Sequence, residues 1–275
     1  MRRLCAFPWY GGKNSHLAWL LPLLPESVSY VEPFGGSAAV LLNRRPAPLE
    51  VYNDLNGEAV NFFRVLRERP DDLVRLLSLT PYAREEFEDS LSYGGDTALE
   101  RARKFFVRAR SCWFAHVKPT PGMWSRNLER KALRANGFSG GVASLGEVAG
   151  RLLGVQIENR PALQVIRDYD REDVLFYVDP PYEPESRRKS DRNVYSFEMD
   201  AEGHRELAAA LNSCKGMAAV SGYDSPLMGE LYPPSRWTKT TGTERRSSHR
   251  GPRTEVLWTN YDPAAGRLVR ETSYA

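Results

Sequence analysis

The stretch VLFYVDPPYEP, Val174–Pro184, decides the fold class. Its first five residues are apolar, which is typical of a strand buried on both faces of a sheet. Asp179 follows, and after it come two prolines that cannot donate hydrogen bonds to a neighbouring strand, so the sheet must end here. The sequence therefore predicts a buried strand whose rigid end presents the Asp179 carboxylate, the Pro180 carbonyl and the Tyr182 ring.

These three groups match a flat ring that carries an exocyclic amine. Asp179 and the carbonyl oxygen of Pro180 can accept the two amine hydrogens. Tyr182 can stack on the ring, an interaction worth roughly 1–3 kcal/mol per base. The alternative is a proline-terminated strand with a solvated acid, and the run of specified residue types favours the ligand site.

Strand-like and helix-like segments alternate on both sides of this stretch. Apart from the opening stretch itself, strands are predicted at 27–32, 49–54, 155–159, 216–224 and 254–262, the last of which closes the chain. Helices are predicted at 16–25, 37–45, 58–68 and 201–213. This alternation predicts an α/β domain built from β-α-β units on a parallel sheet.

The middle of the chain has a different pattern, with successive helices and no strands between them. From Ala98 to Trp113 apolar residues recur on one helical face, and three basic residues lie on the other, namely Arg101, Lys104 and Arg108. Residues 115–144 contain Pro, Gly and basic side chains and show little periodicity. We therefore expect one α/β domain in two halves, 1–71 and 151–275, with a helical, loop-rich insertion at 72–150.

Two other predicted strands end in residues suited to a ligand, and ligands of open α/β sheets bind at the carboxyl ends of strands. The strand at 27–32 runs into Gly35 and Gly36, which allow a tight turn and a close approach of the backbone. The GxGxxG fingerprint is not met, so an ordinary strand-to-helix turn would explain this pair alone. Asp54 follows about twenty residues later, where an acid can hold both hydroxyls of a ribose. It could equally cap the next helix, as could Asn53.

The segment FPWYGGKNS, residues 7–15, has only a superficial likeness to a phosphate loop. Phe7 stands where that loop needs glycine, and Asn14 stands where it needs Ser or Thr. Lys13, with two glycines and neighbouring aromatic rings, instead suits a small ligand that has a carboxylate and a flat ring. A solvated lysine is the alternative.

The composition limits the other possibilities. The three cysteines and four histidines are scattered, which argues against a disulfide framework or a metal site and fits a reducing cytoplasm. No apolar run reaches membrane-spanning length, and the N-terminus lacks the apolar stretch of a secretory signal. The net charge of +3 permits a polyanionic partner without indicating one.

Four motifs then occur in order along the chain: WYGGK at 9–13, EPFGGS at 32–37, YNDLN at 52–56 and DPPY at 179–182. With the tail ERRSSHRGPRTEVLWTNY at 244–261, they resemble the Dam-type adenine-specific DNA methyltransferases. The resemblance covers most of the chain except about 80–150, and the motif order is similar to the alpha group of amino-methyltransferases. It implies a Rossmann-like fold that transfers a methyl group from S-adenosylmethionine to the 6-amino group of a flipped-out adenine in double-stranded DNA.

The resemblance also implies roles for individual residues. The catalytic residues would be Asp179, Pro180 and Tyr182, with Tyr182 stacking on the target base. Lys13 would meet the donor carboxylate, and Asp54 would hold the donor ribose. The full set of implied donor-binding residues is Trp9, Gly11, Lys13, Glu32, Phe34, Gly35, Gly36, Asp54 and Asp179.

DNA contacts are expected from three segments. The stretch from Arg108 to Phe138 is the target-recognition region by position, and in it Arg126 and Asn127 are either base readers or solvated loop residues. Phosphate contacts are expected after the DPPY motif and in the tail, from Arg187, Arg188, Lys189, Arg245, Arg246, Arg250 and Arg253. The expected reaction needs no metal. A cognate restriction endonuclease that acts separately is a further partner that the resemblance allows.

Three other functions are alternatives to adenine methylation of DNA. An N4-cytosine DNA methyltransferase would more often carry serine at the position of Asp179. A protein-glutamine or RNA-adenine methyltransferase usually begins the comparable motif with asparagine. A non-catalytic DNA-binding protein could keep the fold, but it would not need the acids and the lysine of these motifs intact.

Overall fold

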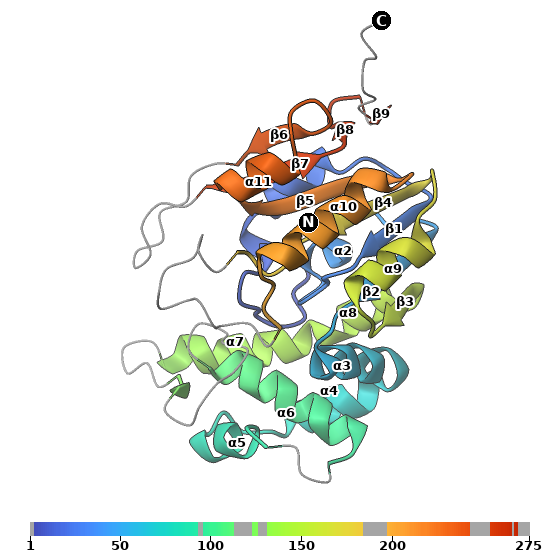
Figure 1. Cartoon of the computed structure of the whole chain (residues 1–275). Helices are drawn as coiled ribbons and strands as arrows, with labels where there is room; N and C mark the ends of the chain where they lie inside the picture. The colour runs from blue at the N-terminus through green and yellow to red at the C-terminus, as the bar shows by residue number, and fades with distance from the viewer. Residues whose placement is uncertain are drawn as a thin grey trace, which may run out of the picture.

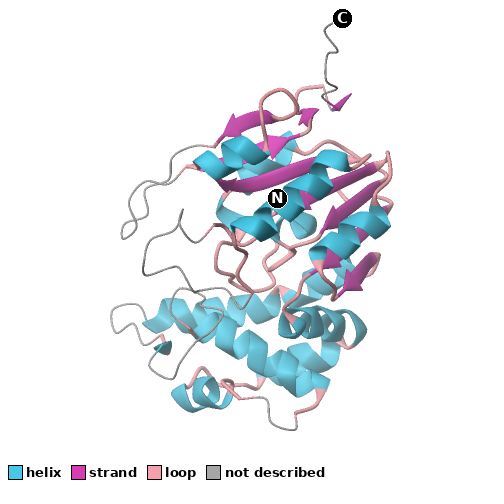
Figure 2. Cartoon of the chain, viewed as in Figure 1, coloured by secondary structure: helices cyan, strands magenta, loops and turns pink. Residues whose placement is uncertain are grey.

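A computed structural model describes residues 3–92, 96–112, 123–125, 131–183, 197–242, 254–265 and 267–268 of the chain. Its centre is a seven-stranded sheet in the order β3-β2-β1-β4-β5-β7-β6. The strands are β1 Ser29–Glu32, β2 Leu49–Asn53, β3 Val155–Glu158, β4 Val174–Val178, β5 Met217–Tyr223, β6 Thr238–Thr241 and β7 Glu255–Thr259. The first five are parallel, and β7 runs antiparallel to both of its neighbours. The predicted α/β fold with a mainly parallel sheet is confirmed (Figures 1 and 2).

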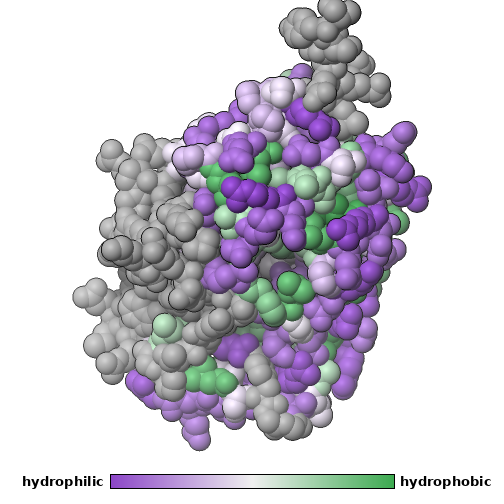
Figure 3. Space-filling model, viewed as in Figure 1, coloured by the Kyte–Doolittle hydropathy of each residue, from purple (hydrophilic) through white to green (hydrophobic). Residues whose placement is uncertain are grey.

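Alternate residues of the central strands face two different cores. On one face, Val31, Phe176 and Val220 pack among the apolar residues of α9 Ala162–Tyr169, α10 Ala201–Ser213 and α11 Pro226–Leu231. On the other face, Tyr30, Tyr52 and Tyr177 belong to a core built mainly with helices from the first part of the chain. All five residues of β4 are buried, as the apolar run from Val174 predicts. The outer surface seen in Figure 3 is mostly hydrophilic where it is described.

The helices of the second face come from both the first segment and the insertion. The first segment gives η1 Lys13–Ser15, α1 Leu17–Leu20, η2 Leu21–Leu23, α2 Ala39–Asn43 and α3 Gly57–Glu68. The insertion gives α4 Pro70–Ser78, α5 Arg84–Asp89, α6 Ala98–Ser111, α7 Lys131–Ala143 and α8 Leu145–Leu152. Helices α4 to α8 gather below the sheet in Figure 1, where α6 packs along α3. Phe105 of α6 and Leu152 of α8 share one core with Tyr52, so the insertion is packed on the sheet's own helices.

Residues 115–144 contain helix where the sequence analysis finds little periodicity. The helix α7 begins at Lys131, and its turn into α8 lies at Ser144. Glycines weaken the apolar pattern here, but one of them fits a specific neighbour. A Cβ atom at Gly141 would come within 2.5 Å of the Arg110 guanidinium, whose Nη2 donates to the carbonyl oxygens of Cys5 and Ala6. Tertiary packing therefore overrides weak helix propensity.

The end of the chain differs from the predicted single strand at 254–262. Strand β7 stops at Thr259, and Asn260 turns its side chain toward the start of β5, where it accepts from the Ala218 N–H and donates to the Gly216 carbonyl. A separate two-stranded pair follows, formed by β8 Tyr261–Asp262 and β9 Arg267–Leu268. The strand β6 and the helix α11 also lie outside the predicted elements.

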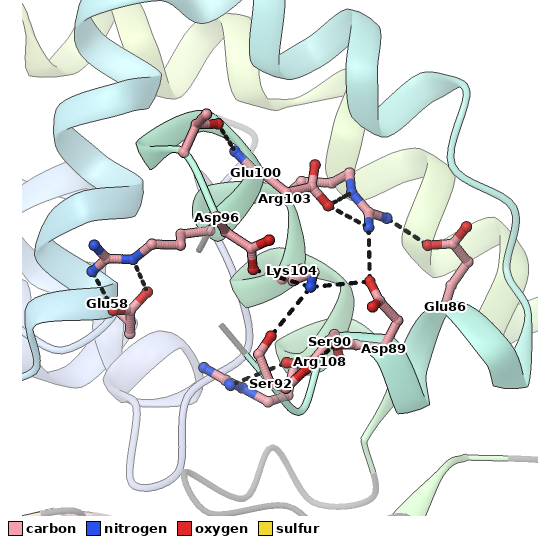
Figure 4. Close-up of polar contacts among 12 residues, drawn as sticks. Glu58, Glu86, Asp89, Ser90, Ser92, Asp96, Glu100, Arg103, Lys104 and Arg108 are labelled. Atoms are coloured by element: carbon pink, nitrogen blue, oxygen red, sulfur yellow. Dashed lines mark hydrogen bonds and ion pairs between the residues drawn. The ribbon is translucent and has the colours of Figure 1, made fainter. Parts of the chain in front are cut away.

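The basic residues of α6 face protein partners, as Figure 4 shows. The Lys104 ammonium pairs with the carboxylates of Asp89 and Asp96 at 3.3 and 3.0 Å. Arg103 is buried and pairs with Glu86, Asp89 and Glu100. These ion pairs tie α5 and the turn after it to α6, which explains how so polar a helical face is buried.

Candidate active site

The parallel strands β1, β2 and β4 end at the same edge of the sheet, and a pocket lies there. Every implied donor-binding residue lines it: Trp9, Gly11, Lys13, Glu32, Phe34, Gly35, Gly36, Asp54 and Asp179. Pro180 and Pro181 also line the pocket, together with Phe197, Glu198 and Met199, which lie before α10. Residues from three distant parts of the sequence are therefore brought to one place. This is the arrangement expected of a ligand site at the ends of parallel strands.

The glycine turn after β1 is shaped by its neighbours. The Gly35 N–H donates to the Asn53 carbonyl at 2.7 Å, and a Cβ atom at Gly35 would lie 2.3 Å from the Tyr52 ring. Gly36 has a φ of +50°, which favours glycine, and it lies against the Trp9 indole. Both glycines are thus required by close packing, and the backbone of the turn is brought to the pocket wall.

Asp54 holds this turn from the end of β2. Its Oδ2 accepts from the Gly36 N–H at 2.8 Å, and its Oδ1 accepts from the Asn56 N–H at 2.7 Å. The cap of α3 is Asn56, whose side-chain oxygen accepts from two backbone N–H groups of the first turn. The alternative that Asp54 or Asn53 caps this helix is therefore wrong. Burial raises the pKa of Asp54, and its two backbone hydrogen bonds oppose that rise.

Asn53 is a structural residue of the site that the sequence analysis treats only as a possible cap. Its side chain is fully buried and donates to the carbonyls of Pro33 and Arg160 at 2.8 and 3.0 Å. Its Oδ1 accepts from the Arg160 N–H at 2.9 Å. One amide thus joins the segments that follow β1 and β3, and it fixes the spacing of the strand ends around the pocket.

Lys13 also lines the pocket, and it contacts a different set of residues from Asp54. Its ammonium nitrogen is 2.7 Å from each oxygen of the Asp179 carboxylate and 3.2 Å from Oε1 of Glu255. It also donates to the Gly11 carbonyl at 3.0 Å. Burial alone would lower the pKa of Lys13, but the two carboxylates outweigh it and raise the pKa. Lys13 is therefore a buried ammonium, and the solvated alternative is wrong.

Asp179 is fixed by more than this ion pair. Ser221 of β5 donates to its Oδ1 at 2.7 Å, and the Tyr177 hydroxyl donates to Ser221 Oγ at 3.2 Å. Burial raises the pKa of Asp179, and Lys13 opposes the rise. Because the lysine stays charged, we assign the pair as a carboxylate beside an ammonium. The side chain is 18% exposed, so the carboxylate reaches the pocket while its orientation is fixed from behind.

Glu32 adds a third acid to the pocket wall. It is 2% exposed, and its Oε1 accepts from the Tyr30 hydroxyl at 2.7 Å. Burial raises its pKa to about 8, an effect that the Tyr30 hydroxyl and Arg44 reduce and that Asp179 increases. Glu32 is therefore mostly protonated at neutral pH, which avoids an unpaired negative charge next to the Asp179 carboxylate.

Tyr182 is held by residues beyond the DPPY motif. Its side chain is 7% exposed, and its ring meets the Tyr223 ring edge-on with centroids 4.7 Å apart. Its hydroxyl donates to Glu255 Oε1, and the Lys13 ammonium lies 5.0 Å from its ring centroid. Tyr182 itself is not among the residues that line the pocket, and its stacking on a base stays a prediction.

The second proline of the motif also has a partner. The carbonyl oxygen of Pro181 lies 3.1 Å from Nε2 of His204, a buried residue of α10. His204, Ser221, Tyr223 and Glu255 contact DPPY without any signal in the sequence. They come from α10, β5 and β7, and only the folded structure brings them together.

The residues expected to contact DNA lie outside the described part of the chain: Arg126, Asn127, Arg187, Arg188, Lys189, Arg245, Arg246, Arg250 and Arg253. The segment directly before Arg126 is described and is anchored. Trp124 forms a β-bridge with Cys112, and the Ser125 N–H donates to the Ser111 carbonyl at 2.8 Å. Tyr82 donates from its hydroxyl to the Ser125 carbonyl at 2.9 Å.

The described residues hold no group of three or more His, Cys, Asp or Glu side chains that could bind a metal ion. No helix among them is both long enough and apolar enough to cross a membrane.

Comparisons with known proteins find similar DNA methyltransferases. The chain is 25% identical over 269 residues to the Type II methyltransferase M1.LlaDCHI of Lactococcus lactis subsp. cremoris, covering 92% of this chain and 94% of that protein. It is 25% identical over 259 residues to the DNA N-6-adenine-methyltransferase of Escherichia phage P1, covering 82% of this chain and 30% of that protein. The model of the D12 class N6 adenine-specific DNA methyltransferases matches residues 9–117 and 143–242, more than half of the chain. The matched segments contain Lys13, Asp54 and Asp179, and the chain belongs to the D12 class of N6 adenine-specific DNA methyltransferases.

Proposed function

We propose that this adenine N6-methyltransferase takes its methyl group from S-adenosylmethionine and acts on an adenine flipped out of double-stranded DNA. The observation that supports this best is the Asp179 carboxylate, which Lys13 and Ser221 hold in place at a pocket that Asp54 also lines. The amine of a paired adenine cannot be reached inside a duplex, so the base must leave the stack at a cost of a few kcal/mol.

The pocket fits the proposed donor. The glycine turn presents backbone at the wall, and the Phe34 ring beside it offers a flat apolar surface. Each oxygen of Asp54 accepts one backbone N–H and keeps lone-pair capacity for a ribose hydroxyl. When bound, S-adenosylmethionine supplies an electrophilic methyl group on a positively charged sulfur. The remaining proposed donor-binding residues are Trp9, Gly11, Lys13, Glu32, Gly35, Gly36 and Asp179.

The chain's own residues prepare the amine for attack. The lone pair of the adenine amine is delocalised into the ring, which makes it a poor nucleophile. Hydrogen bonds from both N–H groups to Asp179 and to the Pro180 carbonyl would localise that lone pair on nitrogen. Lys13 and Ser221 orient the acceptor carboxylate, and Lys13 keeps it ionised. Orienting two reactants in this way can lower the barrier by roughly 7–11 kcal/mol.

The contacts of Lys13 refine its proposed role. The motif resemblance implies that the Lys13 ammonium contacts the donor carboxylate, whereas its described partners are Asp179, Glu255 and the Gly11 carbonyl. We propose that Lys13 acts mainly by holding Asp179. An ammonium has three hydrogens, and these partners already occupy them. A contact between Lys13 and the donor therefore stays a prediction.

We further propose that residues 72–150 read the DNA sequence and that the basic segments bind phosphate. The anchored Trp124 and Ser125 would give Arg126 and Asn127 a fixed base from which to reach the major groove. Arg187, Arg188, Lys189, Arg245, Arg246 and Arg250 are the proposed phosphate ligands. Replacing Arg245 and Arg246 together by alanine should flatten the salt dependence of DNA binding by about one unit of slope per lost contact. An unchanged slope would remove them from the phosphate ligands.

Some of the context stays a prediction. A cognate restriction endonuclease that acts separately follows only from the resemblance of the motifs. We expect the enzyme to act in the cytoplasm, where its DNA substrate would lie.

The test combines donor binding with methyl transfer. The protein is produced in a host without DNA methylation, and the modified bases of the host DNA are mapped by long-read sequencing. The affinity of the purified protein for the donor is measured by calorimetry. Parent protein should methylate adenine, while Asp179→Ala should abolish transfer and keep the fold. Asp168→Ala, on the exposed side of α9, is the matched control and should keep parental turnover. Asp179→Ala turnover within about tenfold of the parent at saturating donor would refute the assigned role.

A further inference from the structure

Glu255 is a buried acid that the methyl-transfer chemistry above does not use. It is the first residue of β7, directly beside Tyr223 of β5, and it is 5% exposed. The next three residues of the strand, 256–258, are buried and apolar. A carboxylate at this position loses its hydration, so it is retained only where partners compensate it.

A single oxygen of Glu255 has two partners, both in the proposed active site. Its Oε1 accepts from the Tyr182 hydroxyl and lies 3.2 Å from the Lys13 ammonium. Lys13 in turn contacts both oxygens of Asp179. The acid therefore joins the aromatic end of the DPPY motif to its carboxylate end by a path outside the motif.

We propose that Glu255 is a positioning residue for methyl transfer, which sets the Tyr182 ring in the orientation that receives the target adenine and holds Lys13 against Asp179. This inference rests on the proposed function and deepens it at the same site. Glu255 touches neither substrate nor donor in this assignment. It acts through Tyr182 and Lys13.

The other contacts of Tyr182 and Lys13 show which constraint Glu255 adds to each of them. The Tyr223 ring limits one side of Tyr182, but an edge-on ring contact does not fix the hydroxyl. Asp179 holds Lys13 from the pocket side, and Glu255 holds it from the β7 side. Without Glu255 the buried hydroxyl loses its acceptor and the ammonium loses one of its two anions. We expect the base-receiving step to suffer more than donor binding, because Asp54 and the glycine turn lie elsewhere in the pocket.

The experiment compares Glu255→Met, Tyr182→Phe and the double variant with the parent, because methionine is about as long as glutamate and offers the Tyr182 hydroxyl no oxygen acceptor. Glu50→Met is the matched control, because Glu50 is a buried acid in an ion pair with Arg151 of α8, away from the pocket. The recognition site is first found by mapping the parent's methylated adenines. Three quantities are then measured: the donor dissociation constant, the fluorescence rise of 2-aminopurine placed at the target adenine, and the single-turnover rate.

Glu255→Met should keep the donor dissociation constant within about threefold, while the single-turnover rate falls by about tenfold or more and the 2-aminopurine fluorescence rise becomes smaller. Tyr182→Phe should weaken the same two readouts, and the double variant should be no worse than Glu255→Met alone, because both substitutions remove the hydrogen bond between Tyr182 and Glu255. Glu50→Met should lower the melting temperature and leave all three quantities unchanged. If Glu255→Met does not fold, Glu255→Asp takes its place, with the charge kept and the acceptor withdrawn from Tyr182.

Two outcomes would overturn the proposal. Glu255→Met could behave like Glu50→Met, with lower stability but parental rate and fluorescence. The double variant could instead show the product of the two single effects, which would make the residues independent. In either case an active, donor-binding parent leaves the proposed function intact. A parent that neither binds donor nor methylates DNA would overturn the proposed function together with this inference.

Discussion

Neutralising Glu32 should make the protein more stable at neutral pH. Glu32 is 2% exposed, and burial raises its pKa from 4.5 to about 8. Between these two pH values the folded protein holds a proton that the unfolded chain has released. The free energy of unfolding therefore falls as the pH rises through this window. Glu32→Gln removes the titration, while its amide oxygen can still accept from the Tyr30 hydroxyl.

The size of the effect follows from the two pKa values. Each unit between them is worth about 1.4 kcal/mol, so at pH 7 the variant should be more stable than the parent by about 3 kcal/mol. Above pH 8 the difference should level off at about 5 kcal/mol, and near pH 4 it should vanish. A new amide N–H without an acceptor would subtract about 1 kcal/mol at every pH, which leaves the slope unchanged.

Urea unfolding at pH 5, 6, 7 and 8, without donor or DNA, measures this difference. Glu230→Gln, at an exposed position on α11, is the control for removing one carboxylate. The reasoning is refuted if the difference between Glu32→Gln and the parent stays constant from pH 5 to pH 8. It is also refuted if that difference grows as the pH falls.

Two further predictions concern packing and buried charge. Gly35→Ala should destabilise the protein by about 1–3 kcal/mol, since its Cβ would lie 2.3 Å from the Tyr52 ring. Gly57→Ala is the control, because its Cβ would meet nothing closer than 3.7 Å, and equal melting temperatures for the two variants would contradict the argument. Arg103→Leu should cost about 1–3 kcal/mol in urea unfolding, because it leaves three acids of α5 and α6 without their common partner. The exposed ion pair of Arg45 provides the contrast, and Arg45→Leu should change stability by less than about 1 kcal/mol.

Periodicity and strand-end chemistry predict the sheet and half of the site. Asp54 and Asp179 follow apolar strands directly, so the rule that ligands bind at the ends of parallel strands is enough to bring them together. Ser221 and Glu255 carry no such signal. Ser221 lies inside a strand, and Glu255 stands where a solvated charge would be equally natural. Ser221 lies beside Asp179 because β5 neighbours β4, and Glu255 lies near Tyr182 because β7 follows β5 in the sheet, so both depend on the strand order.

The helices of the insertion show a different limit of prediction. For α6 the apolar spacing gives the helix, but burial of Arg103 and Lys104 depends on acids from α5 and the following turn. For α7 the glycines hide the helix, and the one at 141 is explained only by the Arg110 side chain that passes it. In both cases the missing information lies in another element of the fold that packs against the helix.

The Lys13–Asp179–Glu255 cluster has a consequence for how the protein becomes active during synthesis. The ribosome makes Lys13 first, Asp179 later and Glu255 last. Strand β7, which carries Glu255, inserts between β5 and β6, so these two strands lack their shared neighbour until it emerges. A nascent chain that already holds the glycine turn and the DPPY motif is thus still incomplete. Methylating activity should appear only once the chain has been released far enough for β7 to dock.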